Sequence, residues 1–120
     1  MFAQEGIAAQ FREGKKVKGF TAFLACLRVR PLCIAIDEKH QIGVYIAESP
    51  NPHKAPYSFG VYKSGEPWTL QPGIWLIPGV EQTSDNTLSA TIKEVTETTV
   101  KFELRCNNTV HEEMFNWTPA

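Results

Sequence analysis

The chain has 120 residues, of which 42% are apolar and 21% are charged, and its formal net charge is -1 at pH 7. This length predicts a single domain over residues 1–120, with a core large enough to need no metal ion or disulfide as a staple. The composition argues against a disordered chain. The near-neutral charge argues against a general electrostatic attraction to nucleic acid.

The charge is spread unevenly along the chain. Residues 1–60 carry eight Lys or Arg and five Asp or Glu, a formal charge of +3. Residues 61–120 carry four and eight, a formal charge of -4. The basic residues of the first part include Lys15, Lys16, Lys18, Arg28 and Arg30. The three lysines form a candidate basic patch for an acidic partner or a phosphate backbone, and a solvated surface is the alternative interpretation.

The first predicted element is an amphipathic helix over residues 2–13. Its apolar residues fall near one side: Phe2, Ile7, Ala8 and Phe11. Gly14 follows as a typical C-terminal stop.

Residues 19–32 are ambiguous between helix and strand. Four apolar residues repeat at helical spacing: Phe20, Phe23, Leu24 and Leu27. Pro31, however, disfavours a helical conformation at Arg30. We therefore expect a strand or an extended segment here.

From residue 32 onward, alternating apolar and polar residues predict short antiparallel strands. The expected strands cover residues 32–37, 42–48, 57–63, 68–70, 73–77, 87–95, 99–105 and 110–117. The hairpin of 87–95 and 99–105 has the clearest pattern, with Val100, Phe102 and Leu104 facing inward.

The hairpin of residues 32–37 and 42–48 shows two distinct faces. One face is expected to carry Leu32, Ile34, Ile36, Ile42, Val44 and Ile46. The small residues Gly43 and Ala47, on either side of Tyr45, face the other way and predict close packing against a further layer, such as the N-terminal helix. The elements together predict a mainly β (α+β) fold, a small antiparallel β-barrel or sandwich of about seven or eight short strands with one N-terminal helix.

The cysteines are Cys26, Cys33 and Cys106. An odd number cannot pair fully within one chain, and no C-x-x-C spacing indicates a metal site. The N-terminal residues lack the basic start and apolar run of a signal peptide. We therefore expect buried, reduced thiols in a cytoplasmic protein, with a Cys26–Cys106 or Cys33–Cys106 bridge as the alternative if the protein is exported.

Motifs for catalysis and cofactor binding are missing or incomplete. Residues 14–21 begin like a phosphate-binding loop, but Phe20 stands where that motif needs its lysine. His111 begins a fragment of H-E-x-x-H that lacks the second histidine, and a strand would place His111 and Glu113 on one face. There is no G-x-S-x-G elbow. We expect neither an enzyme nor a metal or cofactor site.

Aromatic residues cluster in the middle of the chain: Tyr57, Phe59, Tyr62, Trp68 and Trp75. Such residues suit binding surfaces, but they also fill the cores of small β proteins. If Ile74 and Leu76 are core residues, alternation leaves Trp75 exposed. Just before this cluster, residues 49–60 form a proline-rich loop that is expected to be stiff and to present side chains at little entropic cost.

These features predict a non-catalytic binding protein of the small inhibitor or immunity type, which engages a protein partner. The candidate contact residues are His53, Lys54, Tyr57, Tyr62, Trp68 and Trp75. One alternative is a small-ligand-binding β-barrel with an aromatic-lined cavity. The other is a nucleic-acid-binding module that uses the basic N-terminal region and stacked aromatic residues.

Overall fold

The computed structural model describes residues 17–28, 30–50, 55–65, 73–75, 77 and 85–116. The predicted helix over residues 2–13 and the predicted strand over residues 68–70 lie outside this part of the chain. So do Lys15 and Lys16 of the candidate basic patch and three of the candidate contact residues: His53, Lys54 and Trp68.

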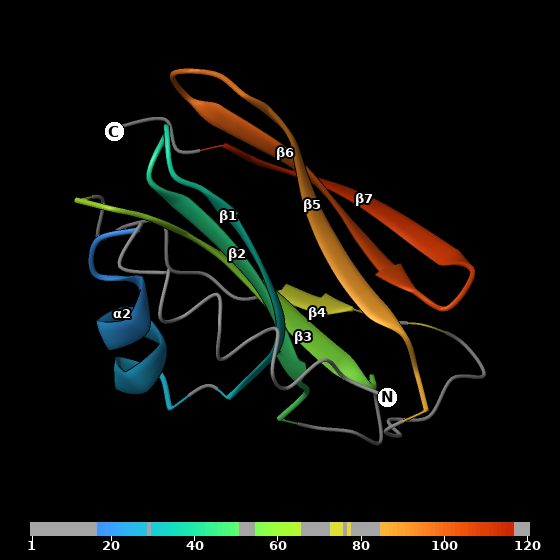
Figure 1. Ribbon diagram of the computed structural model, residues 1–120. Helices are drawn as coiled ribbons and strands as arrows, with labels where there is room; N and C mark the ends of the chain where they lie inside the picture. The colour runs from blue at the N-terminus through green and yellow to red at the C-terminus, as the bar shows by residue number, and fades with distance from the viewer. Residues whose placement is uncertain are drawn as a thin grey trace.

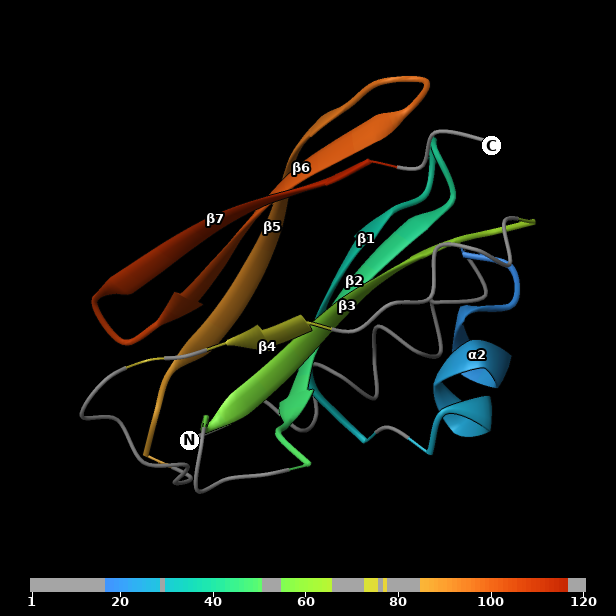
Figure 2. The ribbon, with the colours of Figure 1, turned by 180° about the vertical axis from the view of Figure 1, so that it is seen from behind.

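The described strands form two antiparallel sheets (Figure 1). The first sheet contains, in spatial order, β1 (Pro31–Asp37), β2 (Ile42–Glu48), β3 (Tyr57–Lys63) and β4 (Gly73–Trp75). The second sheet contains β5 (Leu88–Val95), β6 (Thr99–Cys106) and β7 (Thr109–Asn116). All these strands were predicted, with bounds that differ by one or two residues. Helix α2 (Phe20–Cys26) lies against the face of the first sheet that points away from the second sheet (Figures 1 and 2).

A hydrophobic core fills the space between the two sheets. Val44 on β2 and Leu104 on β6 are fully buried there, and Trp75 on β4 is only 1% exposed. The inward positions predicted for β6 are confirmed, because Val100 and Phe102 belong to the same core. β5 lies beside β1 and β2, so the two sheets meet along this side.

The register of β1 corrects one predicted face. The pairing of β1 with β2 shifts between Pro31 and Cys33, and such an irregularity changes the face on which the preceding residue lies. Leu32 therefore packs in the core between the sheets, whereas Ile34 packs on the opposite face with α2. The expectation that one face of this hairpin carries all six apolar residues was wrong, because Ile34 and Ile36 lie on the α2 side, whereas Leu32 and the three β2 residues lie in the core between the sheets.

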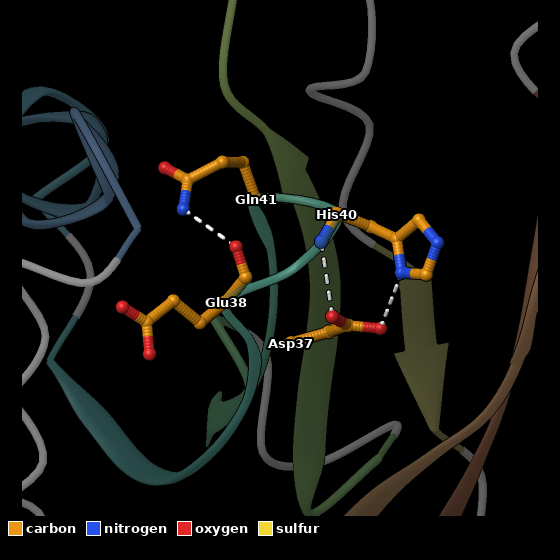
Figure 3. Close-up of polar contacts among 4 residues, drawn as sticks. All are labelled: Asp37, Glu38, His40 and Gln41. Carbon is orange, nitrogen blue, oxygen red and sulfur yellow. Dashed lines mark hydrogen bonds and ion pairs between the residues drawn. The ribbon is translucent and has the colours of Figure 1, made fainter.

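The turn between β1 and β2 is held by side chains (Figure 3). The Asp37 carboxylate accepts a hydrogen bond from the His40 backbone N–H at 3.0 Å, and its second oxygen lies 2.9 Å from His40 Nδ1. Gln41 donates through Nε2 to the Glu38 carbonyl at 2.8 Å, and its Oε1 accepts from the Lys18 backbone N–H at 2.8 Å. The turn therefore ties the first sheet to the segment that precedes α2.

Residues 19–32 were expected to be a strand or an extended segment, but Phe20–Cys26 form the helix α2, so that prediction was wrong for these residues. Its apolar stripe is buried through Phe20, Phe23 and Leu24, and burial of such a stripe outweighs a weak local preference. The restriction that Pro31 places on its predecessor acts only at Arg30, beyond the end of the helix. The close packing predicted for the small residues of β2 is confirmed, because a Cβ atom on Gly43 would lie 2.5 Å from the Phe20 ring. The element that packs there is α2, whereas the sequence suggested the helix over residues 2–13.

The described part of the chain is therefore a mainly β structure with two antiparallel sheets and one short helix. The end strands β4 and β7 do not pair with one another within the described residues, so the sheets are not closed into a barrel. Among these residues, no helix has both the length and the apolar character that crossing a membrane requires.

Candidate functional site

A cavity of about 540 Å³ opens on the face of the first sheet that carries α2. It lies where the C-terminal end of the helix meets β2 and β3. Its described lining includes Leu27, Arg28, Arg30, Tyr45, Ser49 and Ser58. We call this cavity the α2 pocket.

Tyr45 forms the buried polar wall of the α2 pocket. Alternation along β2 turns its side chain away from the core between the sheets, and its ring lies over Gly60 of the neighbouring strand β3, where a Cβ atom would be 2.5 Å from the hydroxyl oxygen. Phe23 of α2 packs edge-on against the ring, with the ring centroids 6.3 Å apart. The tyrosine is only 1% exposed as a result.

Within the described part of the chain, the Tyr45 hydroxyl has no hydrogen-bond partner. Among the described residues that are not exposed, its Oη is the one buried side-chain oxygen or nitrogen left unpaired. Burial raises the pKa of Tyr45 to about 12, so the group stays protonated near neutral pH and can donate a hydrogen bond. Leaving such a group unpaired costs about 1–3 kcal/mol.

Two arginines supply positive charge at the pocket. Arg28 and Arg30 are exposed and line the cavity, and neither forms an ion pair with another residue of the described part. Glu48 is the only acidic residue in the described lining. The described lining therefore carries more positive than negative charge.

The rest of the described lining combines apolar surface with hydroxyl groups that are already engaged. Leu27 is 37% exposed at the pocket, which is unusual for a large apolar side chain in this molecule. The Ser58 hydroxyl donates to the Glu48 carbonyl at 3.2 Å. Among the polar groups of this described lining, the hydroxyl of Tyr45 is the one that is both buried and unpaired.

The predicted contact residues within the described part lie elsewhere. Tyr57 and Trp75 are buried in the core between the sheets, and the Tyr57 hydroxyl accepts a hydrogen bond from Asn86 Nδ2 at 2.6 Å. Tyr62 stacks on Phe23 with the ring centroids 4.8 Å apart, and its hydroxyl donates to the Lys18 carbonyl at 2.9 Å. None of these residues lines the α2 pocket.

Two features of the sequence did indicate this region. The proline-rich segment of residues 49–60 contributes Ser49, Pro50 and Ser58 to the described lining. Tyr57, chosen from it as a contact, is not in that lining, and His53 and Lys54 lie outside the described residues. Arg28 and Arg30 were counted among the basic residues of the first half of the chain. Tyr45 was not among the predicted contact residues. The signal that could have indicated it is an aromatic side chain that shares a strand face with the small residues Gly43 and Ala47.

His111 and Glu113 form a second pair of reactive side chains that the structure brings together. His111 Nε2 lies 2.9 Å from Glu113 Oε1, which confirms that the two share a face of β7, and the imidazole stacks on Trp75 at 6.0 Å. No group of three or more His, Cys, Asp or Glu side chains in the described ranges is placed to hold a metal ion.

The cysteines correct one expectation and support another. All three are free, so neither of the bridges considered for an exported protein is formed. Cys106 is buried as expected, but Cys26 is exposed, because it lies on the outer side of α2. Burial raises the pKa of the Cys33 and Cys106 thiols.

The α2 pocket thus offers a hydroxyl donor, two guanidinium groups and an exposed apolar side chain, a set suited to holding a ligand. No protein-family model, curated protein or solved structure matches the chain.

Proposed function

We propose that the protein is a non-catalytic binding protein that takes a small organic ligand into the α2 pocket. The observation that carries this proposal is that Tyr45, whose buried hydroxyl is unpaired among the described residues, lines a cavity of about 540 Å³. Known ligand sites have volumes of roughly 300–1,000 Å³, with a few polar groups set among apolar ones. An acceptor on a ligand would satisfy the hydroxyl and remove the free-energy cost of leaving it unpaired.

The proposed site differs from the one that the sequence suggested for a ligand-binding protein. We propose that the two sheets form an open sandwich, which is supported by the core packed between them. An aromatic-lined cavity inside a closed barrel is not needed, because the α2 pocket lies on the outer face of the first sheet.

Binding to a protein partner, in the manner of an inhibitor or immunity protein, has weaker support. Trp75 is buried and so offers no surface anchor. Val110 and Met114 are exposed on β7, but Glu112 stands between them on the same face, and a charge at that position interrupts an apolar patch. Nucleic-acid binding would use the basic patch, of which Lys18 is described and exposed while Lys15 and Lys16 lie outside the described residues.

We also propose that the protein is cytoplasmic. Three free cysteines support this location, because thiols persist in reducing compartments.

The first experiment uses native mass spectrometry of the protein purified from its host. We expect a bound small molecule on the wild type, and a clear loss of that adduct in Tyr45→Phe, which removes only the hydroxyl. Tyr62→Phe is the matched control, because it removes a hydroxyl that is already paired with a backbone carbonyl on the same side of the sheet. An absent adduct, or one that Tyr45→Phe retains in full, would contradict the proposal.

The stability of the ligand-free variants gives a second readout. Tyr45→Phe should leave the free energy of unfolding unchanged or raise it by about 1 kcal/mol, because it removes an unsatisfied group. Tyr62→Phe should lower it by about 0.5–1.5 kcal/mol, because a formed hydrogen bond is lost. Urea denaturation measures both. Equal losses in the two variants would mean that the Tyr45 hydroxyl is paired in the folded protein.

A further inference from the structure

We infer that the ligand of the α2 pocket is an amphiphilic oxyanion, a carboxylate or a phosphate whose charged end binds Arg28 and Arg30 and whose apolar part contacts Leu27. This inference rests on the proposed function and names the chemical class of the ligand. Tyr45 donates a hydrogen bond to an oxygen of the same molecule. Each part of the assignment depends on a different property of the described lining.

The charge balance of the pocket selects an anion. Arg28 and Arg30 both line it, without ion-pair partners among the described residues, against the single carboxylate of Glu48. A guanidinium group presents N–H donors in a planar fork that matches the oxygens of a carboxylate or phosphate. A neutral tyrosine hydroxyl adds one more donor to the same lining.

The backbone of Arg28 provides independent support. Three residues other than glycine have a positive φ in the described part: Arg28 at 57°, Gln41 at 56° and Asn107 at 54°. Gln41 uses its side chain to close its turn, as described above. Asn107 accepts from the Thr87 backbone N–H at 2.9 Å and donates to Asn86 Oδ1 at 3.2 Å. Their side chains account for their presence in an unfavourable conformation.

The Arg28 side chain makes no such local contact with the described residues. The residue stands just after the C-cap Leu27 of α2, and glycine is the usual residue with a left-handed conformation at the end of a helix. The helix dipole favours a cation nearby, but it would do so equally for an arginine in the last helical turn, where no basic residue stands. The dipole therefore does not account for an arginine at a position that favours glycine, whereas binding of an anion in the pocket does.

The apolar part of the ligand is inferred from Leu27. This leucine is one of three large apolar side chains exposed in the described part of the molecule, and it is the one that lines the α2 pocket. A fully polar anion would leave it in water, while an alkyl chain would cover it. An amphiphile therefore satisfies both kinds of surface in this lining.

The test measures binding of defined probes to the full-length chain by isothermal titration calorimetry. Decanoate and decyl phosphate represent the two oxyanions, decanol is the neutral probe, and decyltrimethylammonium is the cationic one. We expect one or both anions to bind more tightly than decanol, with the cation weakest, and the order of the anions tells carboxylate from phosphate. Equal binding of decanol and both anions would overturn the inference but leave the proposed pocket in place.

Arg28→Gly provides the sharpest variant. It removes the guanidinium and relieves the unfavourable φ, so we expect the urea midpoint to rise while the affinity for the preferred anion falls about tenfold or more. Arg105→Gln is the matched control, because it removes an exposed arginine from the second sheet, and it should leave anion affinity unchanged. Unaltered affinity in Arg28→Gly would contradict the assignment.

The experiments separate failure of the inference from failure of the proposed function. If no probe binds, but the native adduct is present and depends on Tyr45, the pocket binds a ligand of another class and only the inference is wrong. If no probe binds and no adduct is found, both fail. Affinity for the anionic probes that is reduced in Tyr45→Phe but not in Arg28→Gly would likewise retain the pocket and reject the role of the arginine in binding the oxyanion.

Discussion

Asp37 is a surface carboxylate whose titration is set by the turn that it closes (Figure 3). Burial of its carboxyl group tends to raise the pKa, but hydrogen bonds and charge from His40, with a further hydrogen bond from the Lys39 backbone, lower it below the ordinary value of 3.8. A carboxyl group with a lowered pKa in the folded state stabilises that state while it is ionised. Its contribution is therefore fully present above the unfolded-state pKa and is lost as the pH falls through the folded-state value.

We expect Asp37→Asn to lower the free energy of unfolding at neutral pH by less than about 1 kcal/mol, because exposed pairs are weak. The difference from the wild type should shrink as the pH falls from about 5 to about 2. Urea denaturation across this range measures it. Glu38→Gln is the control, because its carboxylate in the same turn points away from these contacts (Figure 3). A difference independent of pH would refute the role of Asp37.

At the level of single residues, the sequence could predict alternation but not which side of a short strand is buried. Tyr57, Phe59 and Val61 alternate with other residues along β3, and they pack toward the core. Trp75 could not be assigned in this way, because its strand has three residues and its burial is set by its pairing opposite Tyr57. Tyr45 was overlooked for a related reason. An unpaired hydroxyl is a property of the surrounding fold and leaves no local pattern.

Among the elements, α2 shows how packing overrides a local signal. Helices of this length are unstable alone in water, so the buried stripe of α2 must find a matching surface. Gly43 provides part of that matching surface, because the absence of a side chain lets the Phe20 ring approach the backbone of β2. The alternating strands were easier to predict, since each hairpin partner lies next in the chain. The register shift near Leu32 was not predictable, because both registers satisfy the apolar pattern.

The contact between Phe20 and Gly43 can be measured by a double-mutant cycle. Gly43→Ala places a methyl group against the Phe20 ring and should lower the free energy of unfolding by about 1–3 kcal/mol. In a Phe20→Ala background the methyl group has space, so the cost should largely disappear, with a coupling of at least about 0.5 kcal/mol. Phe23→Ala is the control background, because Phe23 is not among the atoms nearest to the position of the new methyl group. Equal costs in all backgrounds would show that α2 does not pack on Gly43.

For the molecule as a whole, the first sheet is shared by two hydrophobic clusters. One lies between the sheets and includes Val44, Trp75 and Leu104, and the other lies under α2 and includes Phe20 and Phe23. A chain of this composition was predicted to form one domain with one core, and that domain assignment stays a prediction, as does the cytoplasmic location. The division of apolar residues between two faces could not be deduced, because it requires the helix to be recognised first.

Disruption of the two clusters should unfold different parts of the structure. Unfolding the cluster between the sheets separates strands from both sheets, and this corresponds to global unfolding. Detaching α2 exposes only the outer face of the first sheet and leaves the strand pairing intact. Regions that bury few side chains open at a lower free energy than the core strands. We therefore expect the backbone amides of α2 to exchange with solvent through a local opening.

Hydrogen exchange of the wild type and of Leu104→Ala tests this prediction. Leu104 is fully buried between the sheets, and its replacement should lower the free energy of global unfolding by about 2–5 kcal/mol. Exchange in β2 and β6 should accelerate accordingly, while exchange in α2 should keep its wild-type rate, because the local opening does not break the contacts of Leu104. Phe23→Ala is the matched control and should accelerate both, since its contacts are lost in local and global opening alike. Acceleration of α2 in Leu104→Ala to the same extent as β6 would show that the helix and the sheets unfold as one cooperative unit.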